Sequence, residues 1–470
     1  MFIPRPLSPR RLAQYVRILL PSLLLTSCAS LDPQPDITTA ADLASSRVDA
    51  ITQDAWSQPV DTPSTAWNGS DPLHADVALA VAIQNNPRLR LALTIIAQRR
   101  ADVVQAGLLP NPTIGFGIGV AIDGLAGAPA LVQGLQTLTW IWTQPDRIAI
   151  ADAQLQSAIL DAASQTVALA EDVGIAHAAV LAAGNLHTYD TAYVDVAAKT
   201  LRLIRARLDA GETSMLNVNR AEVDLQTART DGIASRRSLE QTKLALLRAM
   251  GWPGHTTDWE AAEPTAATCP ETDSDLELLQ LAATQNLELA SHAAKIEQYV
   301  AAHALATTKK LPEVTFTFGW QNNFGSRRAV MPGAQITIPL FDNGDPAIAK
   351  ANAQLEHARL QWIATANQIE YEVRNTASQW REAAEQVSIT ANSLVPSAAS
   401  ALRRSQFSHA EGVTDLTVLL LAQEHNIDAE RTLVTQRLAE CTSLIRLRRA
   451  VGGTFKTLHA PYVASKRDDS

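Results

Sequence analysis

The side chains that most often carry chemistry do not form a catalytic constellation in this sequence. The ten histidines are scattered, and the two that share one predicted helix, His177 and His187, lie ten positions apart. We expect these two on a helix surface or in a seam between helices rather than around a metal. The acidic residues at 271–275 fall in a linker, and Gly115–Gly119 alternates strictly with apolar residues, as in a strand rather than a phosphate loop. We therefore expect no enzymatic activity, no cofactor and no bound metal.

One cysteine, Cys28, has a predicted chemical role. Residues 1–27 combine a basic start with a short apolar segment that ends in Leu25-Thr26-Ser27, which is typical of a signal peptide. A Leu, two small residues and a Cys resemble the bacterial lipobox, in which the Cys is lipidated and becomes N-terminal after cleavage. The alternative is an ordinary signal peptide that contains a cysteine. Ala29 stands where an Asp would favour the inner membrane, so we expect a covalent lipid on Cys28 and anchoring in the outer membrane.

The other two cysteines do not define a site, and the net charge bears on the possible partners. Cys269 and Cys441 lie 172 positions apart in unlike contexts. An oxidising compartment permits a disulfide between them, but two buried, unpaired thiols fit equally well. The net charge of -9 is spread without long like-charge runs, which argues against nucleic acid as a partner.

Four segments alternate with a period of two, which is typical of strands that have one apolar face. We predict strands over 112–122, 131–143, 313–324 and 330–340. In the third, apolar residues occupy every second position: Val314, Phe316, Phe318 and Trp320, separated by Thr315, Thr317 and Gly319. Everything else between residues 71 and 453 resembles long, alanine-rich helix.

An internal repeat organises the chain. Residues 82–86 (AIQNN) match 282–286 (AATQN), and 151–155 (ADAQL) match 351–355 (ANAQL). Each copy, 71–252 and 274–453, is predicted to hold a helix, two strands and a long helical hairpin, at 146–250 and 345–451. Residues 28–70 are expected to be an extended tether, 253–273 a connector and 454–470 a C-terminal tail.

The helical hairpins are predicted to be unusually long. Each first arm has about 65 residues between strand and turn, or roughly 100 Å of helix at about 1.5 Å per residue. Apolar residues step by three and four along the second arm, as in a coiled-coil seam. Pro396 lies inside that arm and should kink or break it.

These strands fit a membrane pore. About ten alternating residues suit a tilted transmembrane strand, but four strands cannot close a barrel and an open edge is unfavourable in lipid. Closure must then use several chains, and three copies would give twelve strands. Two soluble hairpins packed on a helical bundle are the alternative. We expect the small and polar side chains to face water, namely Gly115, Gly117, Gly119, Thr315, Thr317 and Gln321. We expect the aromatic ones to face lipid, namely Phe116, Trp140, Trp142, Phe316 and Trp320.

The duplicated unit resembles a known family. The passage Pro339–Leu355 and the turn segments Leu208–Val218 and Phe407–Leu416 are similar to those of the outer-membrane factors, the TolC-like channels of tripartite efflux and type I secretion. With Cys28, the resemblance is to its lipoprotein branch. It implies a mainly α fold with four strands per chain, a twelve-stranded barrel in a homotrimer and a periplasmic helical tunnel. The implied partners are a membrane-fusion adaptor, an inner-membrane pump of RND or ABC type and outer-membrane lipid. A periplasmic helical scaffold without a pore is the alternative function.

The resemblance also suggests which residues form the tips and the gate. The two glycine turns would be the periplasmic tips that contact the adaptor, through Ala210, Gly211, Glu212, Thr213, Glu411, Gly412, Val413 and Thr414. Relatives carry acidic residues about two turns past the second Gly, as a cation-binding ring at the closed entrance. Val418 and Leu421 occupy those places here, so gating by a hydrophobic constriction is an alternative to charge supplied by Asp415, Glu411 or Glu212.

Overall fold

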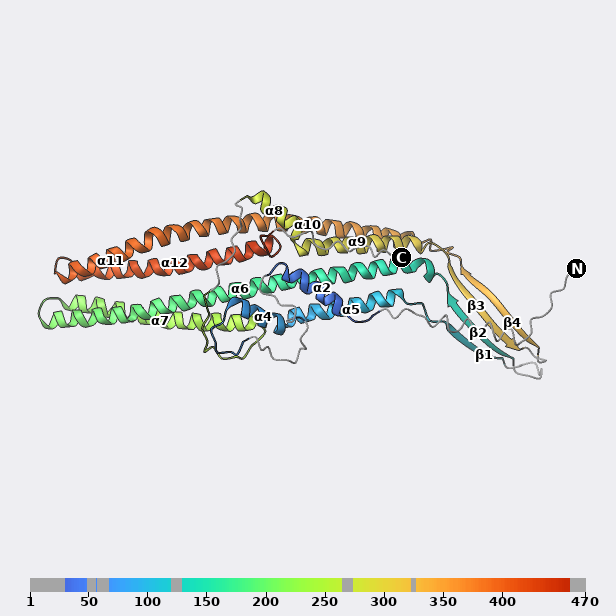
Figure 1. Ribbon diagram of the computed structural model, residues 1–470, viewed down its shortest axis with the longest axis horizontal. Helices are drawn as coiled ribbons and strands as arrows, with labels where there is room; N and C mark the ends of the chain where they lie inside the picture. The colour runs from blue at the N-terminus through green and yellow to red at the C-terminus, as the bar shows by residue number, and fades with distance from the viewer. Residues whose placement is uncertain are drawn as a thin grey trace.

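A computed structural model describes residues 30–48, 56, 67–119, 129–263, 274–322 and 327–456. Over this part of the chain, long helices form an elongated layer, and a four-stranded sheet extends from one end of it (Figure 1). The predicted signal peptide, Cys28, Cys269 and the tail beyond residue 456 lie outside the described residues.

The four strands form one antiparallel sheet in chain order, β1-β2-β3-β4. The two hairpins are therefore neighbours, because β2 of the first repeat pairs with β3 of the second, Val132 opposite Trp320. Strands β1 and β4 have no partner on their outer sides within the described chain. The bounds are β1 Thr113–Ile118, β2 Ala130–Thr137, β3 Glu313–Asn322 and β4 Arg328–Thr337.

The second predicted strand was too long. We expected a strand over 131–143, but β2 ends at Thr137 and helix α6 begins at Trp140. Leu138, Trp140 and Trp142 occupy alternate positions, as in a strand, although Ile141 between the two tryptophans is apolar. These residues form the strand-to-helix junction and the first helical turn. Trp140 and Trp142 are therefore not on a barrel strand.

The helices repeat in the same order in both halves of the chain. A short and a longer helix precede the strands, and in each repeat an asparagine at their junction, Asn86 or Asn286, caps the longer one. A long hairpin follows the strands. The first repeat contains α4 (Ala75–Asn85), α5 (Pro87–Gly107), α6 (Trp140–Asp209) and α7 (Met215–Ala249). The second contains α8 (Asp275–Gln285), α9 (Leu287–Thr308), α10 (Asp345–Ile389), the π-helical segment η1 (Thr390–Leu394), α11 (Val395–Ala410) and α12 (Leu416–Ala450).

The long first arms have the predicted size. Helix α6 has 70 residues, or about 105 Å at 1.5 Å per residue. The matching arm of the second repeat is α10, η1 and α11 in unbroken succession. Its π-helical segment ends two residues before Pro396, which lacks the N–H that an α-helix requires. The helix is not broken at this proline, but it departs from α-helical geometry in the turn before it.

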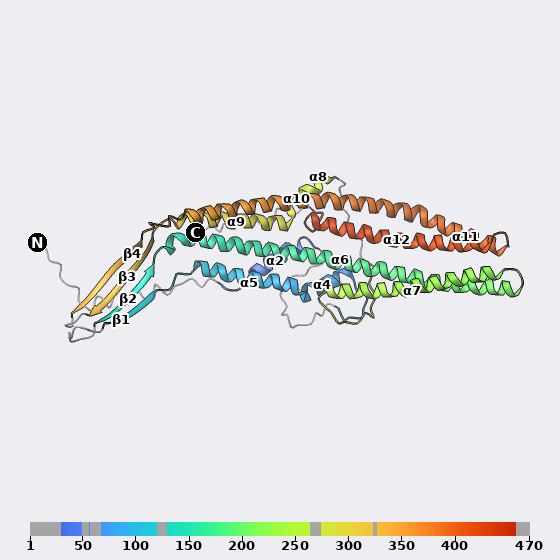
Figure 2. The ribbon, with the colours of Figure 1, turned by 180° about the vertical axis from the view of Figure 1, so that it is seen from behind.

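The helices lie side by side in a single layer. Helix α6 contacts α5 and α7 on one side and α9 and α12 on the other, while α10 and α11 pack beyond α9 and α12. Both views show the α6–α7 and α11–α12 turns at the end far from the sheet (Figures 1 and 2). The edges of the layer are thus α5 with α7 and α10 with α11, and both carry exposed apolar residues: Leu91, Val223 and Ile233 on the first, Leu360, Ile363 and Tyr371 on the second.

The segment before the first repeat is partly helical, which corrects the expected extended tether. Helix α2 (Gln34–Ser45) packs against α5 and α6 and buries Ala40 and Ala44. The Asp36 carboxylate accepts a hydrogen bond from Nε of Arg100 on α5 at 2.6 Å. Just beyond the helix, the buried Arg47 guanidinium donates through Nε and Nη2 to the carbonyl oxygen of Gln285, at 3.3 and 3.2 Å. This segment therefore connects the first repeat to the second.

Helix α6 is also apolar enough, by length and composition, to cross a membrane. Its many alanines give it this character, and several of them, such as Ala162 and Ala163, are buried. Helix α6 contacts six other helices, α2, α4, α5, α7, α9 and α12. Small side chains permit this close packing, so its composition is explained by its central place in the layer.

Candidate channel wall and periplasmic tips

The strand register separates the sheet into two chemically different faces. Paired residues share a face, so Phe116, Val132, Trp320 and Val330 lie in one row across all four strands. Phe316 and Phe318 lie on the same face, because they alternate with polar residues along β3. The opposite face carries mostly small and polar side chains, together with Leu131, Leu135 and Met331. The small and polar ones include Gly115, Gly117, Thr315, Thr317, Gly319 and Gln321.

On β1 and β3 the exposure of the side chains agrees with this division, whereas β4 is exposed on both faces. Phe116 is 78% exposed and Phe318 51%, whereas Gly319, on the other face, is buried. A sheet that exposes a row of aromatic and branched apolar side chains is poorly suited to water on that face. Trp140 and Trp142 lie just below it, in the first turn of α6, and their indole N–H groups have no hydrogen-bond partner among the described residues.

The two turns at the far end of the layer have the same construction. Gly211 and Gly412 adopt φ of 76° and 73°, the left-handed region that glycine tolerates best. In the first turn, the Glu212 N–H donates to the Arg207 carbonyl at 2.8 Å, and in the second the Val413 N–H donates to the Ser408 carbonyl at 2.9 Å. The predicted tip residues are mostly exposed there: Ala210, Gly211, Glu212, Glu411, Gly412 and Val413, with Thr213 and Thr414 half-buried.

The predicted gate residues lie on the first turns of α12. Asp415 is its N-cap, and its carboxylate accepts from the Leu416 N–H at 2.8 Å and the Thr417 hydroxyl at 2.9 Å. The Thr417 hydroxyl and the Leu416 N–H hold the pKa of Asp415 below its ordinary value. Val418 and Leu421, three residues apart on one side of the helix, are 46% and 50% exposed.

Side-chain contacts join the two hairpins near their tips. Nη1 of Arg207 on α6 lies 2.9 Å from Nε2 of His409 on α11. Nη1 of Arg220 on α7 donates to the Thr417 hydroxyl at 3.0 Å. Beneath them, α6, α7 and α12 share an apolar cluster that includes Ile204, Val218 and Leu416.

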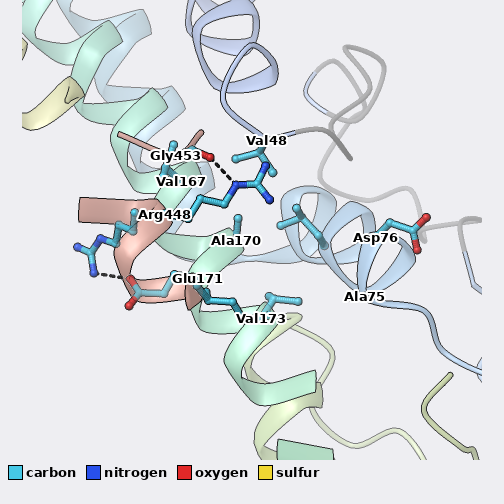
Figure 3. Close-up of a pocket in the computed structure, with 13 residues that line it drawn as sticks. Val48, Ala75, Asp76, Val167, Ala170, Glu171, Val173, Arg448 and Gly453 are labelled. Atoms are coloured by element: carbon cyan, nitrogen blue, oxygen red, sulfur yellow. Dashed lines mark hydrogen bonds and ion pairs between the residues drawn. The ribbon is translucent and has the colours of Figure 1, made fainter. Parts of the chain in front are cut away.

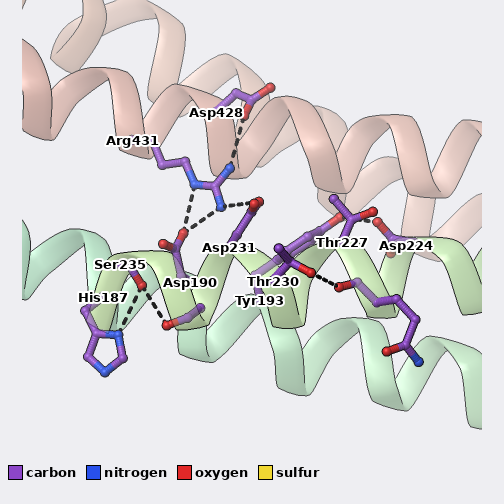
Figure 4. Close-up of polar contacts among 12 residues, drawn as sticks. His187, Asp190, Tyr193, Asp224, Thr227, Thr230, Asp231, Ser235, Asp428 and Arg431 are labelled. Carbon is purple, nitrogen blue, oxygen red and sulfur yellow. Dashed lines mark hydrogen bonds and ion pairs between the residues drawn. The ribbon is translucent and has the colours of Figure 1, made fainter. Parts of the chain in front are cut away.

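A second set of contacts joins the hairpins about halfway along the helices (Figure 4). Arg431 on α12 binds Asp190 on α6 and Asp231 on α7, with Nη2 at 2.6 and 3.2 Å from the carboxylates. Within the first hairpin, the Tyr193 hydroxyl donates to Asp224 at 2.9 Å. Burial raises the pKa of both groups of this pair, with the Tyr193 hydroxyl opposing the rise at Asp224.

The waist of the layer, where α4, α6 and the end of α12 meet, contains a small cavity of about 220 Å³ (Figure 3). Its walls are mostly aliphatic side chains and glycine, and Arg449 of α12 binds Glu171 of α6 at its edge, at 2.6 Å. Nearby, Nε2 of the buried His177 donates to the Leu73 carbonyl at 2.8 Å. In the part of the chain that the structure describes, no group of His, Cys, Asp or Glu could hold a metal ion.

Comparison with known proteins agrees with this architecture. The sequence matches the outer membrane efflux protein family over residues 78–252 and again over residues 278–453. The chain belongs to the outer membrane efflux protein family. It is therefore an outer-membrane efflux channel subunit, with its sheet in the membrane and its helical part in the periplasm, and a scaffold without a pore is not favoured.

The individual relatives have low sequence identity to this chain, but each match covers most of both proteins. The cobalt-zinc-cadmium resistance protein CzcC of Cupriavidus metallidurans is 21% identical over 380 residues, which are 78% of this chain and 85% of CzcC. TolC of Vibrio cholerae is 23% identical over 399 residues, 79% of this chain and 89% of TolC. The crystal structure of VceC from Vibrio cholerae has a TM-score of 0.69 at 17% identity and covers 81% of this chain and 97% of VceC. None of these relatives is named for an enzymatic activity.

Some of the contacts described above had no sequence signal. Arg207 and His409 are 202 positions apart in the sequence. Nothing in either segment predicts that they meet. Helix α2 did have signals, since Pro35 in its first turn and the alanines that follow favour a helix.

Proposed function

We propose that three copies of this chain close a twelve-stranded barrel whose lumen continues into a periplasmic tunnel of helices. The observation that carries this proposal is the sheet itself. It exposes an apolar row and, among the residues that the structure describes, leaves β1 and β4 without outer partners. Hydrocarbon does not tolerate unpaired strand edges. Pairing β1 of one subunit with β4 of the next satisfies both edges. The same step brings the exposed apolar residues of α5 and α7 against those of α10 and α11.

In this assembly the duct is passive and works with two partners. The exposed glycine turns form a ring of six tips, which we propose as the contact surface for a periplasmic adaptor, in series with an inner-membrane pump of RND or ABC type. The gate lies just above the tips, where three copies of Val418 and Leu421 would form an apolar constriction that excludes water. Asp415 is engaged in capping α12, so its carboxylate is less available for a cation ring.

We also propose that Cys28 carries a lipid in the outer membrane, and the position of α2 supports this. Its first turn binds Arg100, which lies seven residues, or about 10 Å, before the end of α5 on the membrane side. The six residue steps from Cys28 to Gln34 could span about 20 Å if extended, which is enough to reach the membrane surface.

One relative suggests a class of substrate. CzcC is named for cobalt, zinc and cadmium resistance, so these ions are the first substrates to test. Export in cells that carry the matching pump and adaptor, with and without this chain, would distinguish metal ions from organic compounds.

The central test is whether the purified protein forms a pore. The purified protein should have the mass of a trimer in detergent and should conduct ions in planar lipid bilayers. A stable monomer that never conducts, even with adaptor present, would overturn the proposal.

A further inference from the structure

The outer edge of β1 presents the backbone groups of three residues to a neighbouring strand. In an antiparallel pair, residues that exchange hydrogen bonds alternate with residues whose N–H and C=O groups point away from the partner. The Gly119 N–H donates to the Pro129 carbonyl oxygen at 2.8 Å, at the end of the β1–β2 pairing. Alternation from this bond turns the N–H and C=O groups of Ile114, Phe116 and Ile118 away from β2.

The same alternation defines the outer edge of β4. The Leu138 N–H donates to the Val314 carbonyl oxygen at 2.8 Å, so the even-numbered residues of β3 bond to β2 and the odd-numbered ones to β4. The register of β3 with β4 then leaves the backbone groups of four β4 residues pointing outward: Val330, Pro332, Ala334 and Ile336. Because proline has no N–H, this edge lacks one donor, at Pro332.

The internal repeat relates the two hairpins residue by residue. Pro110, just before β1, corresponds to Pro312, just before β3, with an offset of 202 positions. Ala151, after β2, corresponds to Ala351, after β4, with an offset of 200. When these offsets are applied to β1 and β2, each pair of the first hairpin coincides with a pair of the second. The sequence repeat and the observed registers therefore agree.

We propose that β4 pairs with β1 of a second copy in the register that β2 and β3 have inside the chain. Applied to the β2–β3 register, the two offsets give three pairs: Ile336 with the partner's Ile114, Ala334 with the partner's Phe116, and Pro332 with the partner's Ile118. All six are residues whose backbone groups point outward, so they can bond without a shift of either strand. This inference rests on the proposed trimer and adds the register of its seams.

The position of Pro332 favours this register over its neighbours. Here Pro332 lies opposite the partner's Ile118, the last residue of β1, where a carbonyl oxygen without a donor is nearest to water. A slip of two residues in one direction brings Pro332 opposite the partner's Phe116, and leaves a carbonyl unpaired in the middle of the strand, in hydrocarbon. A slip in the other direction moves the partner's Ile114 beyond the end of β4. Both slips are therefore less favourable.

The same repeat accounts for an exposed apolar residue on α5. Inside the chain, the hydroxyl oxygens of Ser157 on α6 and Ser291 on α9 lie 3.1 Å apart. With an offset of 200, these serines correspond to His357 on α10 and Leu91 on α5. Leu91 of the partner subunit would therefore lie against His357. Leu91 is 64% exposed in the single chain, whereas Ser291 is buried, so the seam between chains would cover it.

Engineered disulfides in the full-length protein report the register directly. Gly115 and Gln335 are opposite each other in the proposed seam, as a pair that does not exchange hydrogen bonds and has close Cα atoms. Gly115→Cys combined with Gln335→Cys should therefore link neighbouring subunits into a covalent trimer on a non-reducing gel. Cys269→Ser and Cys441→Ser remove the other thiols that could pair, and Cys28 keeps its role in lipidation.

Two further pairs report the slipped registers. Thr113→Cys and Gly117→Cys, each combined with Gln335→Cys, would place their Cα atoms about 7–8 Å apart in the proposed register, which is too far for a disulfide. Each should give less than about a tenth of the linkage of the Gly115 pair. The matched control is Leu135→Cys with Thr317→Cys, the equivalent pair inside the chain. It should form a disulfide that leaves the subunits unlinked.

Proline substitution tests the pairing at Ala334. Ala334→Pro removes an N–H that points away from β3, so the hairpin keeps its own hydrogen bonds while each seam loses one. We expect the trimer to dissociate in detergent at a temperature lower by about 4 °C or more. Pro332→Ala supplies a donor at the end of the seam and should not lower this temperature. Equal temperatures for Ala334→Pro and the wild type would contradict the pairing.

The mass of the protein in detergent separates this inference from the channel proposal. A trimer in which the Gly115–Gln335 pair does not link, or links no better than a slipped pair, would overturn the register and leave the trimer standing. A protein that is only monomeric would overturn both.

Discussion

Nη2 of Arg431 on α12 lies 2.6 Å from Oδ1 of Asp190 on α6, whose side chain is only 8% exposed. A charge this deep in the helical layer depends on its partner, because removing one member of a buried pair leaves the other unpaired in a poor solvent. The same guanidinium reaches Asp231 at 3.2 Å, so one cation on the second repeat serves two carboxylates on the first.

Replacing Arg431 by Met keeps most of the volume of the side chain but leaves Asp190 buried without a cation. We expect a loss of about 2–3 kcal/mol in the free energy of unfolding, because the pair is only partly shielded from water. Urea unfolding followed by the helical circular dichroism would measure it. Asp428→Asn is the control, since that carboxylate is 58% exposed and 3.8 Å away, and it should change stability by less than about 0.5 kcal/mol. Equal losses in both variants would contradict the assignment.

Two glycines with the same backbone conformation should respond differently to alanine. Gly211 and Gly251 have φ of 76° and 71°, but an added Cβ meets nothing within 4 Å at Gly211 and meets the Asn85 carbonyl oxygen at 2.7 Å at Gly251. Gly211→Ala should therefore cost about 1 kcal/mol through backbone strain alone. Gly251→Ala should cost more than about 2 kcal/mol, because the α4–α5 junction must shift as well. Thermal unfolding of the two variants makes the comparison, and similar melting temperatures would count against it.

The two faces of β3 give a direct test of which side meets lipid. Arginine in place of Phe318 would lie in hydrocarbon and should cost about 2–4 kcal/mol if the site is near the bilayer midplane. Arginine in place of the adjacent Thr317 would face the lumen and should be tolerated, with a change in ion selectivity instead. Folding titrations in lipid vesicles and reversal potentials would measure the two effects. If Thr317→Arg were the more destabilising variant, the faces would have been assigned the wrong way round.

His177 should make the waist sensitive to acid. Burial lowers the pKa of His177, with the hydrogen bond to the Leu73 carbonyl opposing the change. The unfolded chain binds a proton at this residue near about pH 6.5 while the folded chain does not. Stability is therefore unaffected above about pH 6.5 and falls as the pH decreases below it. His177→Gln should flatten this part of the stability profile, and the exposed His425→Gln should not. An unchanged slope in His177→Gln would show that burial of His177 is not the cause.

Cys28→Ala should abolish incorporation of labelled palmitate into the mature protein. Mass spectrometry of the N-terminal peptide would detect the lipid in the wild type, and an unmodified wild-type peptide would refute lipidation. Because the barrel itself is held by its apolar face, we expect the variant to form channels in bilayers with unaltered conductance.

The sequence predicted the elements better than the contacts between them. Period-two alternation located all four strands, and the repeat of residues 82–86 at 282–286 located matching helical segments, because these signals are local. Each of these segments was predicted as one helix, whereas the structure has two, which meet at Asn86 and at Asn286. The same alternation misplaced Trp140 and Trp142, since a strand pattern continued past the point where the backbone turns into α6. The misplacement of these two tryptophans did not change the predicted order of strands and helices.

The contacts between the hairpins were not predictable from the chain. Arg431 and Asp190, like Arg207 and His409, are brought together by the layer packing of helices that are far apart in sequence. Charged residues on long amphipathic helices are usually solvated, so their types alone gave no reason to select these four. Only the positions of the helices in the layer show which charges are paired across the seam.

The order of elements across the sheet and the helical layer has a consequence for the proposed ring. The first repeat ends at one edge and the second at the other, so six similar units would meet at two alternating kinds of seam. One kind lies inside a chain and contains Arg431 and His409, while the other lies between chains and joins α5 and α7 to α10 and α11. Because the two kinds of seam are built from different residues, each can be tightened or loosened by mutation without altering the other. The proposed ring would then look six-fold symmetric, while the strength of its seams would follow only three-fold symmetry.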